Sequence, residues 1–193
     1  MFSAVLDTCV LYGSLERDFL LSMAVEGLYR PLWSDVILEE LLECEFEKWA
    51  VRVPADEARR RADRLISELR REFEDSLVGG WERASLNYGL PDPDDEHVVA
   101  VAHFSGAGAV VTRNTKHFPR PLIPAHIDVL HPSEFARLTV EVNPRAAALA
   151  VVAMSNRRGI TGPAMSPDGV LDDIAAKLGL RSVADAIRPH LHE

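Results

Sequence analysis

The sequence contains few cysteines and lacks a long hydrophobic run. Its 193 residues include two cysteines, Cys9 and Cys44, which are too few and too far apart for a disulfide framework or a zinc cluster. We expect both to be small core residues that stay reduced. No apolar run reaches the length of a membrane span, and Met1-Phe2-Ser3 leads into an apolar segment without a basic signal-peptide region. These absences predict a cytoplasmic protein with no membrane partner.

Basic residues and phosphate-binding loops are also scarce. The chain has 21 Lys and Arg against 30 Asp and Glu, a net charge of -9, which argues against binding nucleic acid by general charge attraction. Neither G-x-x-x-x-G-K-[ST] nor G-x-S-x-G occurs. The charge balance still permits an acidic site that metal ions neutralise and that cuts RNA, with local basic surface holding the RNA backbone.

Short apolar segments alternate along the chain with amphipathic ones. Strands are predicted at residues 2–7, 30–33, 109–112 and 127–130, and helices at 15–28, from Ser34 onward, from Pro54 to Gly79-Gly80, at 95–105 and at 134–138. This alternation predicts an α/β fold with a mostly parallel central sheet flanked by helices. Ligands of such sheets bind at the carboxyl ends of the strands.

Acidic residues crowd the turn Asp92-Pro93-Asp94-Asp95-Glu96, which leads into the helix predicted at 95–105. The prolines stiffen the turn, and Asp94 is expected to cap the helix. Capping and compensation of the helix dipole would explain the acids without a function. A bound cation would relieve their mutual repulsion, which is the functional interpretation.

Three separated segments bring polar side chains to the same edge of the predicted sheet. Asp7 ends the first strand, Asn114 follows the strand at 109–112, and Asp95 begins a helix. Glu40 joins them if its face of the helix turns inward, although Glu39 beside it leaves that assignment open. Hard oxygen ligands of this kind are those that Mg²⁺ or Mn²⁺ prefers.

Four segments carry a family resemblance. They are Asp7-Thr8-Cys9-Val10-Leu11, Glu40-Leu41, Asp92-Pro93-Asp94-Asp95-Glu96-His97 and Val111-Thr112-Arg113-Asn114-Thr115-Lys116-His117-Phe118-Pro119. Their order and spacing resemble the PIN-domain nucleases, and the closest branch has a DPDD-x-H turn and an Asn where many relatives carry the last acid. Many members of the family are VapC-type toxins of toxin–antitoxin pairs. The resemblance covers roughly residues 1–138.

The resemblance implies a Rossmann-like sandwich, a Mg²⁺- or Mn²⁺-dependent ribonuclease, frequent homodimers and an antitoxin protein as partner. Asp7, Glu40 and Asp95 match the three acids of the family, and Asn114 matches the weaker fourth position. Asp92 is a candidate ligand for a second ion, and a turn residue otherwise.

Two departures from the family pattern bear on a second metal ion. Asn114 adds no charge, and His117 stands where this branch often has Asp. We interpret His117 as a surface residue. Arg113 and Lys116 lie beside the predicted site and either contact RNA phosphates or carry solvated charge. His97 is interpreted as a core or rim histidine of its apolar helix.

The residues from 139 to 193 are predicted to form a helical extension to a PIN-like domain at 1–138. We expect a helix from Pro144 to about Ser155, a break at Arg157-Arg158-Gly159, a helix after Ser166, and a last helix capped by Ser182. Two alternatives to the nuclease stay open. One is a catalytically weak module that binds RNA or protein, and the other is a nucleotide or phosphate hydrolase on the same fold.

Overall fold

The computed structural model describes residues 1–84, 87–161 and 163–192. Its contacts divide the chain into two compact units. The α/β unit comprises Ser3–Tyr12 and Pro31–Leu130, and the helical unit comprises Met1–Phe2, Gly13–Arg30 and His131–Glu193. The chain therefore crosses between the units several times, and every residue of the predicted site belongs to the α/β unit.

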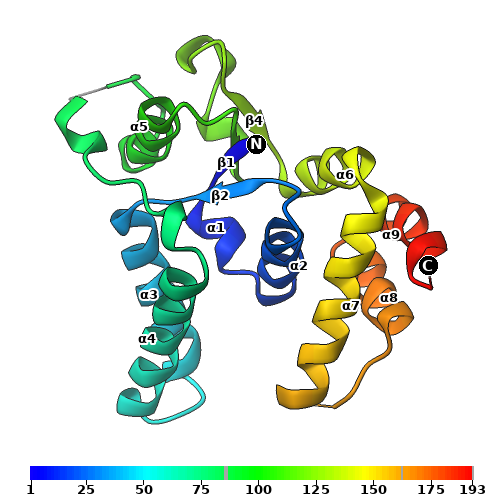
Figure 1. Cartoon of the computed structure of the whole chain (residues 1–193). Helices are drawn as coiled ribbons and strands as arrows, with labels where there is room; N and C mark the ends of the chain where they lie inside the picture. The colour runs from blue at the N-terminus through cyan, green and yellow to red at the C-terminus, as the bar shows by residue number, and fades with distance from the viewer. Residues whose placement is uncertain (85–86, 162, 193) are drawn as a thin grey trace. The chain divides into compact units, whose positions relative to one another are not determined.

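A sheet in the order β2-β1-β3-β4 forms the centre of the α/β unit (Figure 1). Its strands are β1 (Ser3–Leu6), β2 (Arg30–Leu32), β3 (Ala109–Val111) and β4 (Asp128–Leu130). The β1–β3 and β3–β4 pairs are parallel. Ala4, Val5 and Leu6 are fully buried, as expected for a strand whose sequence has no charge until Asp7. The α/β fold with a central parallel sheet is confirmed.

Helices cover this sheet in the α/β unit. They are α1 (Thr8–Leu11), α3 (Asp35–Ala50), α4 (Ala55–Glu72) and α5 (Glu96–Ser105), with 3₁₀ turns η1 (Glu74–Ser76), η2 (Trp81–Ala84), η3 (Pro93–Asp95), η4 (Thr115–His117) and η5 (Arg120–Leu122). Ser34 caps α3 by accepting from the Ile37 amide, as predicted. α3 packs along α4, and α5 packs on β1 and β3 (Figure 1).

The direction of α5 decides where its acids lie. α5 leads into β3 through a tight turn at Gly106, whose φ of 67° suits glycine. A helix that returns the chain to the start of a parallel strand runs opposite to that strand. The amino end of α5, where Asp95 lies, therefore sits toward the carboxyl ends of β1 and β3.

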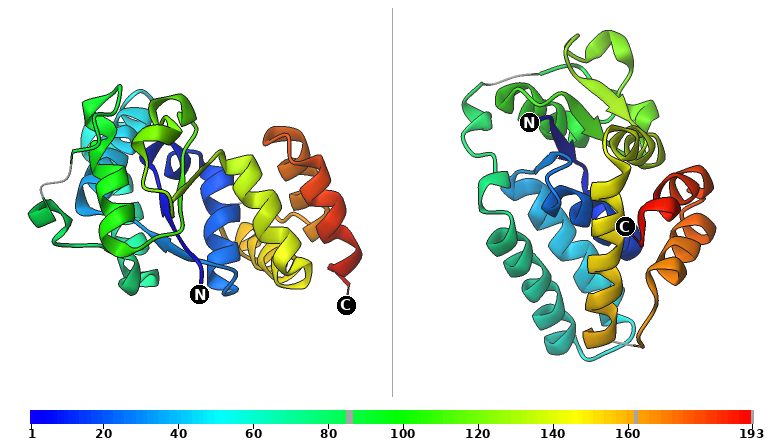
Figure 2. Two further views of the ribbon diagram at one scale, coloured as in Figure 1. Left: turned by 90° about the horizontal axis from the view of Figure 1, so that it is seen from above. Right: turned by 45° about the vertical axis from the view of Figure 1, so that its right-hand side comes forward.

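The helical unit is built around α7. Its elements are α2 (Ser14–Val25), α6 (Pro132–Val142), α7 (Pro144–Thr161), α8 (Pro167–Lys177), α9 (Arg181–Ile187) and the 3₁₀ turn η6 (Arg188–His190). α7 packs against α2, α6, α8 and α9 (Figure 2). The Arg157 guanidinium lies 2.7 Å from Asp18 of α2 and donates to Ser22 at 2.5 Å. These contacts place residues 14–25 with the C-terminal helices.

Several predicted boundaries in the helical unit are wrong. α7 continues through Arg157-Arg158-Gly159, where a break was expected, and α9 begins at Arg181 with Leu180 at the N-cap, so Ser182 does not cap it. α6 extends past Leu138 to Val142. None of the helices in the described residues is long and apolar enough to span a membrane. The domain boundary after Leu138 stays a prediction, since contacts alone do not define a folding unit.

Candidate active site

Asp7 is a buried carboxylate at the carboxyl end of β1. Its side chain is 5% exposed, and its backbone amide donates to the Val111 carbonyl, which keeps it in line with β3. Two side chains donate to Oδ2 of Asp7: the Thr112 hydroxyl at 2.6 Å and the Cys9 thiol at 3.0 Å. Within the described residues Oδ1 of Asp7 accepts no hydrogen bond, so this oxygen is available to a ligand.

Cys9 contributes as a hydrogen-bond donor. Burial raises the pKa of its thiol to about 12, and the adjacent charge of Asp7 raises it further. The Arg113 amide donates to the same sulfur at 3.2 Å. Cys9 is partly exposed, so the expectation of a plain core residue misses its contact with Asp7.

We expect Thr112→Val to weaken metal binding by about 10- to 100-fold, because outer groups that orient a ligand typically have effects of this size. Thr112 is fully buried, and valine keeps its shape while removing the hydroxyl. Isothermal titration with MnCl₂ measures the affinity. Thr139→Val is the matched control, since Thr139 is buried and bonds the Phe135 carbonyl in the helical unit. Equal affinities of the two variants would show that Thr112 does not orient a ligand.

Asp92, Asp95 and His117 gather beside Asp7. One donor atom of each lies within 4.8 Å of the others, and His117 Nδ1 lies 2.8 Å from Asp95 Oδ2 and 3.7 Å from Asp92 Oδ2. Burial raises the pKa of Asp95, and the charges of Asp7 and Asp92 add to this, while the hydrogen bond with His117 opposes it. Asp7 and Asp95 are thus close enough to repel, which a cation would relieve.

The raised pKa of Asp95 predicts the sign of a stability change. The folded protein holds this proton more tightly than the unfolded chain, so the stabilising contribution is present at low pH and is lost as pH rises through the folded pKa. At neutral pH without metal, Asp95→Asn should therefore raise the melting temperature. Thermal unfolding in EDTA checks this, and a lower melting temperature for the variant would contradict it.

Glu40 of α3 reaches the start of α1. Its Oε2 accepts from the Thr8 hydroxyl at 2.5 Å, and its Oε1 lies 3.1 Å from His97 Nε2. Burial acts to raise the pKa of Glu40, but the hydrogen bonds from His97 and Thr8 outweigh it and hold the pKa below its ordinary value. Glu40 therefore faces inward while its neighbour Glu39 is exposed, which is the arrangement on which its assignment depended.

The three predicted acids are brought to one region without forming a tight cluster. Within the described residues, the donor atoms of Asp7, Glu40 and Asp95 do not form a group within 4.8 Å. Glu40 is directed to His97 and Asp95 to His117, so an imidazole neighbours each carboxylate. Oxygen donors with like charges beside an open Asp7 oxygen nevertheless match the chemistry that a divalent ion requires.

The remaining predicted residues lie on the loop after β3. The Asn114 side chain is exposed, while its backbone amide donates to the Thr112 hydroxyl oxygen at 3.0 Å. Arg113 and Lys116 are also exposed. These three positions therefore border the buried Asp7 from the solvent side, where an RNA backbone would approach.

The acidic turn is held by a carboxylate that sequence reasoning did not single out. Glu96 accepts from the Tyr88 and Leu90 amides, both at 2.7 Å, and so ties the preceding loop to the first turn of α5. Asp94 does not cap this helix as predicted: Asp95 occupies the N-cap of α5, and the Asp92 side chain accepts from the Asp94 amide. The backbone amides thus select a different acid for each role.

Sequence reasoning also missed three partners of the acids. Thr112 was interpreted as the end of a strand, His97 as a core or rim residue and His117 as a surface residue, yet each contacts a candidate acid. The available signal for Thr112 was its position one residue after a buried strand that is parallel to β1. The two histidines belong to the motif segments, but their spacing does not reveal which acid each one faces.

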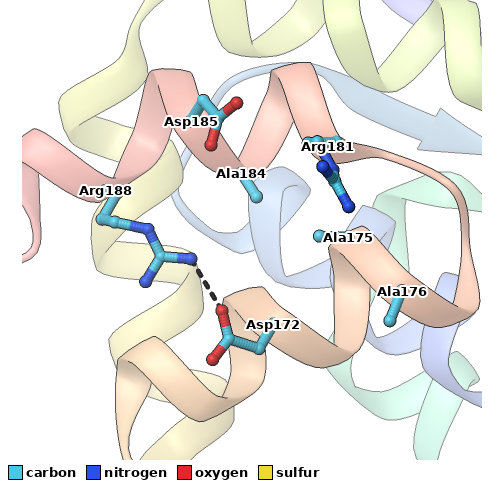
Figure 3. Close-up of a pocket in the computed structure, with 7 residues that line it drawn as sticks. All are labelled: Asp172, Ala175, Ala176, Arg181, Ala184, Asp185 and Arg188. Carbon is cyan, nitrogen blue, oxygen red and sulfur yellow. Dashed lines mark hydrogen bonds and ion pairs between the residues drawn. The ribbon is translucent and has the colours of Figure 1, made fainter.

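A pocket of about 390 Å³ lies between α8 and α9 of the helical unit, apart from these acids. Its lining residues are Asp172, Ala175, Ala176, Arg181, Ala184, Asp185 and Arg188 (Figure 3). Arg188 bonds Asp172 across the pocket and also bonds Asp168. These ion pairs hold α9 against α8, which gives the charges a structural role.

Comparison with known proteins agrees with this geometry. No curated protein and no solved structure matches the chain. A family model described as a PIN domain matches residues 3–116, from β1 to the loop that carries Asn114 and Lys116. Since this match spans more than half of the 193 residues, the chain belongs to the PIN domain family.

Proposed function

We propose that the protein is a divalent-metal-dependent endoribonuclease that hydrolyses RNA phosphodiester bonds. Membership of the PIN domain family supports a nuclease, and the acidic cluster supports a metal-dependent one. The observation that carries the proposal is the nearness of buried Asp7 to Asp95 at the carboxyl edge of the sheet, where Asp7 raises the pKa of Asp95. Such repulsion has a use if a cation binds there.

Asp7, Glu40 and Asp95 are the residues proposed to hold Mg²⁺ or Mn²⁺. A divalent ion in such a site supplies charge stabilisation and an activated water for in-line displacement at phosphorus. Asp7 is oriented for this role by Thr112, and Glu40 by Thr8, since each hydroxyl donates to one oxygen of its carboxylate. We assign Asn114 to orienting water or phosphate at the rim of the site.

Arg113 and Lys116 are proposed to hold the RNA backbone. Both are exposed and flank Asn114 on the loop after β3, so their charges can meet phosphates next to the acids. This local positive charge would offset the repulsion between RNA and a chain of net charge -9. The acidic net charge therefore predicts strongly salt-dependent RNA binding, carried by a few basic residues.

The test compares Glu40→Gln with Glu39→Gln in the cleavage of a labelled single-stranded RNA with MnCl₂ or with EDTA. Both changes remove one carboxylate from the same helical turn, but Glu40 faces Thr8 and His97 while Glu39 is exposed. We expect cleavage by the parent in MnCl₂ and none in EDTA. Glu40→Gln should lower the rate by about 100-fold or more, and Glu39→Gln should leave it unchanged.

Two results would reject the proposal. Cleavage that persists in EDTA would exclude the metal-dependent mechanism. Absence of both cleavage and Mn²⁺ binding in the parent would favour a module that binds RNA or protein without cutting. The neutral Asn114 and the occupation of Glu40 by His97 are the observations that favour this alternative.

A biological role as the toxin of a type II toxin–antitoxin pair extends the proposal. It is supported by the resemblance to VapC-type toxins, and it implies an antitoxin protein as partner and a homodimer as a common assembly. Inducible expression of the parent should arrest bacterial growth, whereas Glu40→Gln should not. Normal growth with the active parent expressed would reject the toxin role while leaving the ribonuclease proposal standing.

A further inference from the structure

Asp92, Asp95 and His117 present three metal-ligand atoms from two segments of the chain. Asp92 and Asp95 flank the 3₁₀ turn η3, and His117 ends the 3₁₀ turn η4. The separations from His117 Nδ1 are 2.8 Å to Asp95 Oδ2 and 3.7 Å to Asp92 Oδ2. Neighbouring ligands bound about 2.1 Å from one ion stand about 3 Å apart, so small side-chain adjustments suffice to bind one.

The backbone already holds these donors in place. Oδ1 of Asp92 accepts from the Asp94 amide at 3.1 Å, and the carboxylate also turns Oδ2 toward His117. The His117 amide donates to the Asn114 carbonyl at 2.8 Å, which closes the turn that presents the imidazole. The donor set is therefore preorganised on two short turns, one of which is anchored to α5 through Glu96.

Exposure of the three side chains leaves room for an ion and its waters. Asp92 and His117 are 43% and 42% exposed, and Asp95 is 17% exposed. Asp95 is shared, because it also lies beside Asp7 and belongs to the proposed nuclease site. An ion at the Asp92 side of Asp95 would thus be the neighbour of an ion held by Asp7 and Asp95.

We infer that Asp92, Asp95 and His117 form a second divalent-metal position, in which the His117 imidazole selects transition ions over Mg²⁺. Imidazole nitrogen suits Zn²⁺, Ni²⁺ and Fe²⁺, whereas Mg²⁺ favours an all-oxygen shell. His117 takes the place of a missing acid in this set, because Asn114 brings no charge. The inference rests on the proposed nuclease function, since both positions share Asp95.

The competing explanation is that His117 only orients Asp95. Without metal, both oxygens facing His117 Nδ1 are acceptors, so the ring donates a proton from Nδ1 to Asp95. Coordination instead needs the neutral ring with its proton on Nε2. The two explanations differ in whether a metal–nitrogen bond forms, which spectroscopy detects directly.

The decisive measurement is electron spin-echo envelope modulation of Mn²⁺ bound to the full chain, which reports ¹⁴N nuclei coordinated to the ion. The parent loaded with MnCl₂ should show coordinated ¹⁴N, and His117→Gln should lose that signal while still binding Mn²⁺. His126→Gln is the matched control, because His126 is an exposed histidine of the same unit that contacts the His103 ring. It should keep the signal.

Titration calorimetry with ZnCl₂ and MgCl₂ tests selectivity independently. His117→Gln should weaken Zn²⁺ binding by about 10- to 100-fold and change Mg²⁺ binding by less than about threefold. His117→Asp should reverse the preference toward Mg²⁺, because it completes an all-oxygen set.

The inference is overturned if Mn²⁺ bound to the parent shows no coordinated ¹⁴N, or if His117→Gln weakens Zn²⁺ and Mg²⁺ equally. Either result with RNA cleavage intact would leave the proposed nuclease standing and assign His117 to orienting Asp95. Failure of the nuclease proposal is a separate outcome, recognised by a parent that does not cleave and by Glu40→Gln without effect on metal binding.

Discussion

Asp7→Asn should lower the rate of metal-dependent RNA cleavage by about a thousandfold while leaving the fold intact. Loss of a charged ligand in such a site removes several kcal/mol of transition-state stabilisation. Asparagine keeps the shape of the side chain, and its amide oxygen can still accept from the Thr112 hydroxyl and the Cys9 thiol. Single-turnover cleavage of a labelled RNA in MnCl₂ measures the effect, and circular dichroism checks the fold.

The matched control for this prediction is Asp128→Asn. Asp128 is exposed and begins β4, so it lies at the amino end of a strand parallel to β3, whereas Asp7 follows the carboxyl end of β1. This control removes the same charge from the opposite edge of the sheet and should leave the rate unchanged. A folded Asp7→Asn protein that cleaves at the parent rate would show that the chemistry occurs elsewhere.

Val151→Asp should destabilise the protein by about 3 kcal/mol or more, because it buries an unpaired charge. Val151 is fully buried in α7, the helix that packs against α2, α6, α8 and α9. For a chain of this size such a loss corresponds to roughly a 10 °C fall in melting temperature. Differential scanning calorimetry on the full chain measures it.

Leu149→Asp is the control in the same helix. Leu149 is 57% exposed, so its replacement should change the unfolding free energy by no more than about 0.5 kcal/mol. Equal destabilisation by the two variants would mean that the effect reflects helix propensity and not burial. It would then contradict the packing of α7 at the centre of the helical unit.

The strands and the acids that follow them were predictable because their pattern is local. A parallel strand buried on both faces appears as an uninterrupted apolar run, so the first charge after β1 falls at Asp7. The parallel direction then places Asp7 near the end of β3, where Thr112 follows. The roles of these acids as ligands stay predictions, because they depend on a metal ion.

What could not be predicted depends on contacts distant in sequence. His117 is 22 positions from Asp95, and its approach depends on the geometry of the 3₁₀ turn η4, which no periodic pattern specifies. In α7, charged residues beside Gly159 resemble the end of a helix. Arg157 instead finds Asp18 of α2, and Arg158 finds Asp173 of α8, so tertiary ion pairs accompany the continued helix.

The thiol beside the candidate site has a consequence for chemical reactivity. Thiolate is the form that alkylating agents and oxidants attack, and a pKa of about 12 leaves only on the order of 10⁻⁵ of Cys9 as thiolate at neutral pH. Desolvation and the charge of Asp7 therefore protect a partly exposed sulfur from iodoacetamide and peroxide. A cysteine next to a nucleophile-activating site thus stays inert under oxidative stress, and the carboxylate that it orients keeps its hydrogen bond.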